Sequence, residues 1–433
     1  MLRTHILSSF QWMLFIVSGN IVAPIGIASM YGLSTEMTVE FVSRTFIVLA
    51  ISGLLQVLFG HRLPINEGPA GLWWGVFTLY SNLGLVLFGS QAETLRVLEF
   101  ALIVSGVICI LLSMLGLLDR LAKYFTPVVT GTYLLLLVVQ LSGSFLNGLL
   151  GVDSIDGKVS SSMMIVSTIV VIFAFLFTTH NQLKKIGIIG SLTIGWIIFA
   201  MVGYADKIEV PDKLISLPEI FVFGIPRVEW SIVPTVIFVT LLLITNMLAS
   251  VKIVESVFKL EHVNFEKISI KKTGVLMGVG QILAGLFSAI GPVPISGSGG
   301  FIASSKITSR IPFIIASSLI IVGSLFTPFI TFIAALPPAV GYAAIFPIFA
   351  SMISLGLKEI VNAYNVEDAV RKVGVPLFAG VGVMFVPSQA FSTLPPIVSS
   401  LLSNGLVFGT LIALFIEIAS KRDLEKSKTV RIP

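Results

Sequence analysis

Apolar residues in this chain fall in long runs, separated by short clusters of glycine, proline and charged residues. The runs are about twenty residues long, which is the length that an α-helix needs to cross roughly 30 Å of hydrocarbon. Strands of a membrane β-barrel would be about half as long and would alternate between apolar and polar residues. The pattern therefore predicts an all-α polytopic membrane protein.

Hydropathy divides the chain into fourteen crossings, of which twelve are full length and two are short. The first half is expected to cross at 8–29, 39–59, the short 69–84, 99–118, 126–149, 161–179 and 186–204. The second half is expected to cross at 231–251, 273–290, the short 298–309, 311–334, 338–356, 373–393 and 400–419. Seven crossings per half reverse the orientation of the second half, so the halves are predicted to form an inverted repeat.

We expect a first repeat over 1–204, an extracellular linker over 205–230, a second repeat over 231–420 and a basic cytoplasmic tail over 421–433. The basic residues support this division, because Lys and Arg gather at the cytoplasmic ends of membrane helices. With the N-terminus inside, those ends hold 21 of the 27 Lys and Arg residues, and the outer ends hold 6. Both termini are therefore expected in the cytoplasm, and the protein in the cell (cytoplasmic) membrane.

The composition agrees with a membrane protein and argues against other classes of protein. Hydrophobic residues make up 55% of the chain and charged residues 11%, which leaves too little polar surface for a soluble protein. The formal net charge of +5 is explained by topology, so no nucleic-acid partner is expected. Cys109 is the single cysteine, so a disulfide framework and a cysteine metal site are excluded, and we expect it to act in packing.

Two interrupted stretches stand at matching places in the two halves. LPINEGPAGLWW occupies 63–74 and VPISGSGGF occupies 293–301, which aligns Pro64 with Pro294 and Glu67 with Gly297. Glycine and proline cannot sustain a regular helix there, and the freed backbone groups must face protein or water. Paired broken segments of this kind are typical of secondary transporters, whose binding site lies at the breaks.

Glu67 is the main candidate for chemistry within these stretches. By this segmentation, all of the 22 acidic residues except Glu67 and Glu417 fall in loops or at the ends of crossings. A carboxylate in a membrane segment is costly unless it is protonated, paired or functional. The alternative is that Glu67 lies near the cytoplasmic surface, five residues after Arg62, where it is wet and paired with a base. Glu417 is expected to pair with Lys421 one helical turn later.

Asn246 and the pair Trp73 and Trp74 are further candidates. The amide of Asn246 can donate and accept at once, which suits a planar heterocycle, although an amide in a membrane helix can equally join two helices. The two indoles could stack on a flat ring, or could be interfacial anchors. Other amides are expected to be packing contacts, namely Gln11, Asn20, Gln140, Gln281 and Gln389.

Several kinds of chemistry are not expected. None of the four histidines falls in the middle of a crossing, which argues against a buried histidine relay and a histidine metal site. The chain has no Walker loop and no catalytic serine elbow, so neither an ATP-driven pump nor a hydrolase is predicted. We expect no cofactor, no metal and no enzymatic activity.

Four stretches carry a resemblance to a known family. They are QWMLFIVSGNIVAPI at 11–25, the glycine-proline stretch of the third segment, PVVTGT at 127–132, and SGGFIASSKITSR at 298–310. The chain resembles the nucleobase-ascorbate transporter (nucleobase:cation symporter-2) family, which includes uracil, xanthine and uric acid permeases. In the family's tenth-segment signature, Ser298 stands for an Asn and Ser305 for a Thr, while Gly300 and Ser309-Arg310 match.

The resemblance implies fourteen segments in two inverted sevens, with a core domain, a gate domain and short antiparallel strands in segments three and ten. It also implies uptake coupled to H⁺ or Na⁺, with an eighth-segment glutamate and a tenth-segment carboxylate or amide that hold the base. Here Asn246 takes the first position and Gly297 or Ser298 the second, and Trp12 replaces the family's histidine. Both family carboxylates are therefore absent, and we hypothesise that Glu67 supplies the missing group.

The sequence thus predicts a nucleobase importer of the purine or uracil/xanthine type in the lipid bilayer. Eight residues are expected to bind the substrate. The expected substrate-binding residues are Glu67, Ala70, Gly71, Trp73, Asn246, Gly297, Ser298 and Gly299, and Glu67 is also the candidate for proton coupling. Two other functions stay open, an anion (sulfate or carboxylate) carrier of the same architecture and a transport-dead membrane sensor. A homodimer is compatible with these expectations.

Overall fold

The computed structural model describes residues 2–152, 158–180, 183, 187–204, 213–334, 337–361, 363, 366–391, 394, 398, 402 and 404–429. The chain divides into two compact units, the first formed by Met1–Leu115 and Phe145–Ile348 and the second by Gly116–Ser144 and Phe349–Pro433. Each unit therefore draws residues from both halves of the sequence. The expected inverted-repeat boundaries follow the sequence and stay a prediction.

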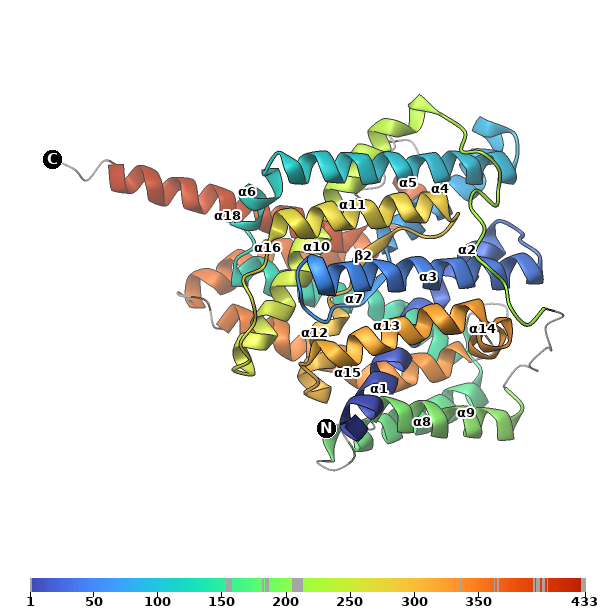
Figure 1. The fold of residues 1–433 in the computed structure, drawn as a ribbon. Coiled ribbons are helices and arrows are strands. Elements are labelled where there is room, and N and C mark those ends of the chain that lie inside the picture. Colours follow the sequence, from blue (N-terminus) through green and yellow to red (C-terminus); the bar gives the residue numbers. More distant parts are fainter. Residues whose placement is uncertain are drawn as a thin grey trace. The chain divides into compact units, whose positions relative to one another are not determined.

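The structure is almost entirely helical (Figure 1). The elements of the first unit are α1 (Leu2–Asn20), α2 (Val22–Met30), α3 (Thr35–Phe59), β1 (Glu67–Pro69), α4 (Gly71–Phe88), α5 (Gln91–Met114), α8 (Ser161–Thr179), α9 (Gly187–Val202), α10 (Val233–Leu260), α11 (Ile270–Leu286), β2 (Pro292–Pro294), α12 (Gly297–Ser305), α13 (Arg310–Leu325) and α14 (Thr327–Ala334). The second unit contains α6 (Leu117–Ala122), α16 (Val366–Met384) and α18 (Gly405–Thr429). Helices α7 (Pro127–Leu150) and α15 (Pro338–Val361) contribute to both.

Each of the fourteen expected segments coincides with a helix, and the prediction of a helical membrane protein is confirmed. Five helical stretches in the described part of the chain are long and apolar enough to cross a membrane. The full count of fourteen crossings stays a prediction. Two segments that were expected to be continuous are broken, the first at Ile21 between α1 and α2 and the eleventh at Phe326 between α13 and α14.

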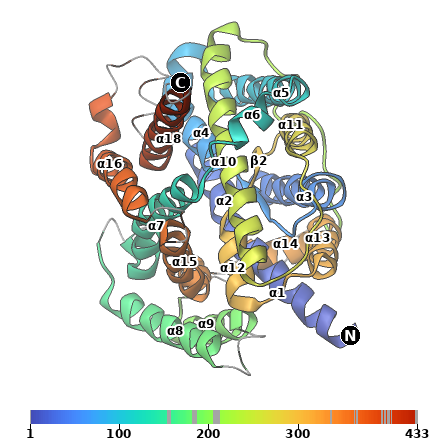
Figure 2. The same cartoon turned by 90° about the vertical axis from the view of Figure 1, so that its left-hand side faces the viewer.

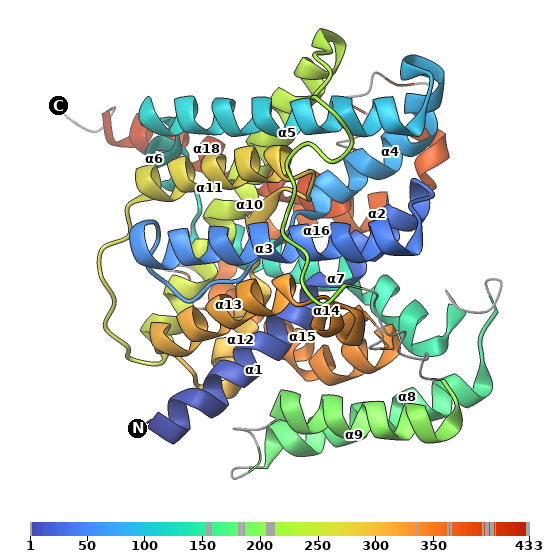
Figure 3. The same ribbon diagram turned by 45° about the vertical axis from the view of Figure 1, so that its right-hand side comes forward.

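Small residues bring the central helices of the first unit close together. Helices α5 and α11 run side by side (Figures 1 and 3). At their crossing, a Cβ on Gly106 would lie 2.5 Å from the carbonyl oxygen of Gly278, and a Cβ on Gly278 would lie 2.6 Å from that of Gly106. One turn away, the buried Cys109 thiol donates to the Gly274 carbonyl oxygen at 3.2 Å. The predicted packing role of Cys109 is confirmed, and the close approach is the kind that small residues permit.

The same eight-residue pattern occurs in α3 and α11. GLLQVLFG at 53–60 and GVGQILAG at 278–285 share glycine, glutamine, leucine and glycine at the same spacing, 225 positions apart. Their first glycines also have similar surroundings, because a Cβ on Gly53 would lie 3.2 Å from the Phe313 ring of α13. Helices α3 and α13 pack as α11 and α5 do, so the pattern supports an internal repeat.

Helices α8 and α9 form a pair within the first unit (Figure 2). Gly190 and Gly195 of α9 lie against Phe177 and Val170 of α8, where a Cβ would lie 2.8 Å from each side chain. The pairing thus also depends on residues without side chains at the contact.

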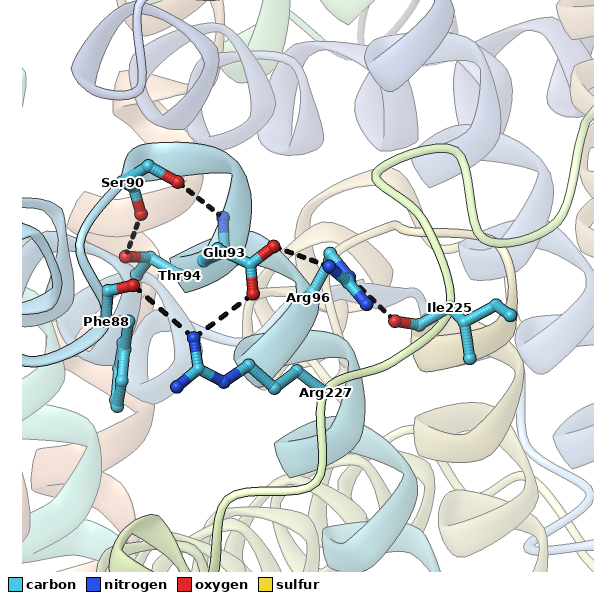
Figure 4. A network of polar contacts seen from close by, with 7 residues as sticks. All are labelled: Phe88, Ser90, Glu93, Thr94, Arg96, Ile225 and Arg227. Atoms are coloured by element: carbon cyan, nitrogen blue, oxygen red, sulfur yellow. Dashed lines mark hydrogen bonds and ion pairs between the residues drawn. The ribbon is translucent and has the colours of Figure 1, made fainter.

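The described part of the linker lies across the ends of several helices of the first unit. Three of its N–H groups donate to helix carbonyls, Ser216 to Leu325, Phe221 to Leu286 and Arg227 to Arg96. Glu93 of α5 accepts from the guanidinium groups of Arg96 and Arg227, and Arg227 also donates to the Phe88 carbonyl oxygen at 3.4 Å (Figure 4). The linker is therefore fastened to α13, α11, α5 and α4.

A buried carboxylate lies under this linker. Glu99, in the third turn of α5, is 2% exposed and accepts a hydrogen bond from the Ser288 hydroxyl. The Ser288 oxygen in turn accepts from the Val222 N–H at 2.9 Å. The expectation that Glu99 lies at the end of a crossing is wrong, because α5 begins at Gln91, eight residues earlier than its apolar run suggests.

In the second unit, α16 and α18 pack together through glycines, and a Cβ on Gly380 would lie 2.8 Å from the Gly405 carbonyl oxygen. The Gln140 side chain accepts from the Leu406 N–H at 2.8 Å, which confirms that this amide is a packing contact. Glu417 is mostly buried and lies 3.7 Å from the Lys372 ammonium. The Lys421 side chain, its expected partner, lies outside the described residues.

Gly106→Ala is expected to destabilise the protein, because the added Cβ would meet the Gly278 carbonyl oxygen and force α5 and α11 apart. Overpacking of this kind costs about 1–3 kcal/mol. Thermal unfolding in detergent measures the change. Gly143→Ala in α7 is the matched control, because Gly143 is exposed and has no atom within 4 Å of its Cβ position. Equal unfolding temperatures for the two variants would contradict the assignment of Gly106 to a tight crossing.

Candidate functional site

The two broken segments meet in a two-stranded antiparallel sheet. Strands β1 and β2 pair Glu67 with Pro294, Gly68 with Val293 and Pro69 with Pro292. The pairing is extended at both ends, because Ala70 N–H donates to the Gly291 carbonyl at 2.9 Å and Ile295 N–H to the Asn66 carbonyl at 2.8 Å. The antiparallel strands expected in segments three and ten are therefore confirmed.

The register of this sheet corrects the alignment of the two halves. The two outer hydrogen bonds are equivalent under a twofold rotation, which places Ala70 on Ile295 and Asn66 on Gly291, both 225 positions apart. That offset equals the one between the glutamine patterns of α3 and α11. Glu67 is thus equivalent to Pro292, and the expected match of Glu67 to Gly297 is wrong. The shared Leu/Val-Pro-Ile letters had produced a false alignment.

Two half-helices begin directly after the strands. Helix α4 starts at Gly71 and α12 at Gly297, so their N-terminal N–H groups and positive dipole ends lie next to the crossing.

Proline is tolerated in β1 and β2 because each strand has an open edge. Gly68 is required by close approach, since a Cβ there would lie 2.5 Å from Ile295 and 2.8 Å from the Asn20 side-chain oxygen.

A pair of asparagines joins α1 to the crossing. The side-chain amides of Asn20 and Asn66 donate to each other's oxygens at 3.3 and 3.0 Å. The Asn66 N–H also donates to the Ser298 hydroxyl of α12 at 2.9 Å. Asn20 ends α1 at the break before α2, so three interrupted segments are linked through the side chains of Asn20, Asn66 and Ser298. The sequence singled out Ser298 and the packing role of Asn20 but missed Asn66.

Trp73 is a packing residue in this structure. Its indole is fully buried, and its Nε1 donates to the Gln281 side-chain oxygen at 2.7 Å. The Gln281 amide nitrogen donates to the Pro292 carbonyl oxygen at 2.6 Å. A fully buried indole bonded to Gln281 fits neither the interfacial anchor nor an open stacking surface, so a packing role replaces both expectations for Trp73. Trp74 is partly buried and lies against α2, where a Cβ on Gly26 would be 3.3 Å from its ring.

Helix α10 packs against both β2 and α12, which brings Asn246 to the same region. Asn246 is half-buried, and its side-chain oxygen accepts from the Ser250 hydroxyl at 3.3 Å. Gly299 is buried at the α10 contact, where a Cβ would lie 2.7 Å from Ile253, and its N–H donates to the Ser296 carbonyl. Gly299 thus supports packing here, and ligand binding by its amide stays a prediction.

The remaining predicted binding residues differ in how exposed they are. Ala70 is fully buried and its N–H belongs to the sheet, while Gly297 and Ser298 are buried at the start of α12. Gly71 is exposed, and no atom lies within 4 Å of the position of a Cβ. Gly75, one turn further along α4, is open in the same way. The backbone at the start of α4 is therefore exposed next to the crossing.

Glu67 is buried beside a histidine. Its side chain is 1% exposed, and its Oε1 lies 3.6 Å from the Nε2 of His61, which is also 1% exposed. Neither of these two atoms has a hydrogen-bond partner among the described residues. Glu67 is thus not wet and not paired with Arg62, so that alternative is wrong. His61 lies beyond the end of α3 and not in the middle of a crossing, as expected, but it is buried because the turn after α3 folds inward.

Arg62, by contrast, points outward. It has φ +60° and donates to Glu266, which also accepts from Arg310 at 3.3 Å. Hydrogen bonding to Arg62, with a further contribution from Arg310, lowers the pKa of the Glu266 carboxyl, which lies in the loop between α10 and α11. Glu266 therefore stays ionised at neutral pH and holds Arg62 away from Glu67.

The described residues contain no group of three or more His, Cys, Asp and Glu side chains placed to hold a metal ion. Within the two strands, the ionisable side chain is that of Glu67.

Comparison with known proteins agrees with this architecture. A model of a permease family, the xanthine/uracil permeases, matches residues 3–389. The chain belongs to the nucleobase-ascorbate transporter family. This family member is 43% identical over 419 residues to a Bacillus subtilis protein described as "Putative purine permease YwdJ", with 94% of each chain covered. It is 24% identical over 416 residues to the xanthine permease of Bacillus subtilis, with 94% of this chain and 92% of the relative covered.

Solved structures share the fold of this nucleobase-ascorbate transporter family member. The transmembrane domain of the cyanobacterial bicarbonate transporter BicA superposes with a TM-score of 0.55 at 14% identity, covering 95% of this chain and 97% of the other. The similarity concerns the fold alone. Together with the family assignment, it identifies a multi-pass membrane transporter and not an enzyme.

Gln281→Leu is expected to lower the unfolding temperature more than Gln56→Leu, its equivalent in α3. The first change leaves both the Trp73 indole and the Pro292 carbonyl without a partner, whereas the second removes one bond to the Thr273 carbonyl. Each buried polar group left unpaired costs about 1–3 kcal/mol. Thermal unfolding and the tryptophan emission maximum measure the two effects. The assignment is contradicted if Gln56→Leu is the more damaging change.

Proposed function

We propose that the protein is a secondary transporter that imports a nucleobase, of the purine or uracil/xanthine type, by proton symport. The observation that carries this proposal is the strand crossing with two half-helix N-termini and open backbone at Gly71. Half-helices that begin at a break are the usual binding elements of secondary transporters. The printed names of the relatives, a purine permease and a xanthine permease, support the choice of substrate.

The base is proposed to bind at the start of α4, against the backbone at Gly71. N–H groups at a helix start favour a carbonyl oxygen, and purine and pyrimidine bases carry carbonyls in the ring plane. Asn246, half-buried on the neighbouring α10, adds a donor and an acceptor. Ser298 and Gly297 close the site at the start of α12, and Ala70 and Trp73 hold its frame.

Proton coupling is proposed to reside on Glu67. An ionised carboxylate with an unpaired, buried oxygen is costly, so binding a proton stabilises the buried conformation. No other carboxylate of the described residues lies in the two strands or the first turns of α4 and α12. Fourteen crossings, cytoplasmic termini and a location in the cell membrane belong to the same proposal and are supported by the distribution of Lys and Arg.

An anion carrier is the second candidate, because helix N-termini also bind anions and the fold occurs in a bicarbonate transporter. No Lys or Arg lies in β1, β2 or the first turns of α4 and α12, so a fixed counter-charge is missing there. This favours a neutral base over sulfate or a carboxylate.

Purified protein in proteoliposomes is expected to accumulate radiolabelled uracil, xanthine, hypoxanthine or uric acid when an inward proton gradient is applied. A proton uncoupler should abolish accumulation, because the gradient is the energy source. Unlabelled base in excess should lower the uptake of the labelled base, and sulfate at the same concentration as the unlabelled base should not. Competition by sulfate alone would favour the anion carrier, and binding without counterflow would favour a sensor.

Glu67→Gln is expected to abolish accumulation and the pH dependence of uptake, because the amide has a similar shape but cannot release a proton. Counterflow of labelled base at equal pH should persist, since exchange needs no net proton movement. Glu417→Gln in the second unit serves as the control. Accumulative, pH-dependent uptake by Glu67→Gln would remove Glu67 from the coupling mechanism.

A further inference from the structure

His61 is a buried ionisable residue to which the proposed transport function assigns no role. It follows the end of α3 by two positions, is 1% exposed and lies beside β1. Its Nδ1 accepts a hydrogen bond from the Leu63 N–H at 3.0 Å. In a neutral imidazole one nitrogen accepts and the other donates, so this bond fixes the ring proton on Nε2.

The Nε2–H group faces a carboxylate oxygen. Nε2 lies 3.6 Å from Oε1 of Glu67, which is longer than a hydrogen bond and shorter than the distance at which a water could fit between them. A movement of less than about 1 Å would close it into a hydrogen bond of ordinary length. Because Nδ1 is occupied by a backbone amide, His61 cannot pass a proton through its ring. It can only donate to Glu67.

A donor of fixed direction treats the two states of Glu67 differently. An ionised carboxylate accepts from Nε2–H strongly, whereas the protonated carboxyl gains less, because hydrogen bonds to charged groups are the stronger ones. The imidazole therefore favours the state that remains after the proton has left.

We infer that His61 is a positioning residue for proton release, a neutral donor that stabilises the Glu67 carboxylate once its proton has gone to water. The inference rests on the proposed proton coupling at Glu67. In the balanced step, the Glu67 O–H bond breaks, the proton leaves as hydronium, and the His61 N–H stays intact. His61 thereby lets a buried acid give up the proton that substrate transport has carried.

The surroundings leave His61 as the partner of this acid. The elements packed against β1 are α1, α3 and β2. Their ionisable residues lie within the first three turns of the helices, while β2 has none; they are Arg3 and His5 of α1 and Glu36, Glu40 and Arg44 of α3. The adjacent Arg62 is engaged with Glu266.

The turn that carries His61 is also fixed in place. Gly60 N–H and Arg62 N–H both donate to the Gln56 carbonyl oxygen, at 2.9 and 3.1 Å. The positive φ of Arg62 turns its side chain outward and leaves His61 facing inward. The imidazole is therefore held beside Glu67 by the backbone.

Titration of the protonated carboxyl band by infrared spectroscopy tests this inference on purified protein without any substrate. The band of Glu67 is assigned by its absence in Glu67→Gln. In His61→Phe, which has no donor, we expect the protonation midpoint to rise by about one pH unit or more, the shift that follows from losing one hydrogen bond to a charged group. In His61→Gln, whose amide can donate, the midpoint should stay near that of the wild type.

Uptake gives a second readout. The midpoint of pH-dependent uptake should move upward in His61→Phe by a similar amount, while counterflow at equal pH is retained. His180→Phe, at the exposed end of α8, is the control and should change neither midpoint. If Phe does not fit the buried space, His61→Leu takes its place in both measurements.

An unchanged Glu67 midpoint in the folded Phe or Leu variant would overturn the inference, as would an equal rise in His61→Gln. These outcomes are independent of the transported substrate. Failure of the wild type to transport any base would reject the proposed function and leave the infrared result standing.

Discussion

Backbone hydrogen bonding inside a membrane protein is the constraint on which this structure depends. A break in a membrane segment frees N–H and C=O groups that hydrocarbon cannot satisfy. Here the two breaks satisfy each other, because the chain on either side of Gly68 and Val293 forms one short ladder. Neither break is stable without the other, so the halves of the sequence must fold together around this sheet.

The surroundings of the sheet follow from its position. Gly68 must lack a side chain so that Ile295 and Asn20 can approach, and the Trp73–Gln281–Pro292 chain of hydrogen bonds fixes α4 against α11. Buried polar groups of this kind are stable only when they are paired. The facing atoms of Glu67 and His61 are among the buried polar atoms that have no partner within the described residues, and both belong to ionisable groups beside the sheet.

The sequence predicted the helices well, because long apolar runs and glycine-proline breaks are local signals. It also predicted that the third and tenth segments form antiparallel strands, through the family resemblance. The register was mispredicted, since two shared residues, a proline and an isoleucine, outweighed the longer Gly-x-x-Gln pattern of α3 and α11. A hydropathy profile averages polarity over a window of residues, so it does not detect that pattern.

The burial of residues in turns was also not predicted from the sequence, because it depends on the tertiary structure. His61 stands between a glycine and an arginine in a polar stretch, which is typical of an exposed loop. Only the fold places it under β1, because the backbone at Arg62 adopts a left-handed conformation. Two helical residues have partners that are also distant in sequence, since Glu99 accepts from Ser288 and Trp73 donates to Gln281.

The corrected register has a consequence for direction. In a duplicated scaffold, equivalent positions have the same backbone geometry on opposite sides of the membrane, so a symmetric sequence would behave alike from either side. Here the equivalents of Asn66 and Glu67 are Gly291 and Pro292, which have no polar side chain. The acid is therefore present at one of the two equivalent positions and absent from the other. The two sides of the crossing have matching outer backbone hydrogen bonds but differ in side-chain chemistry, so they need not respond alike to a substrate or a proton.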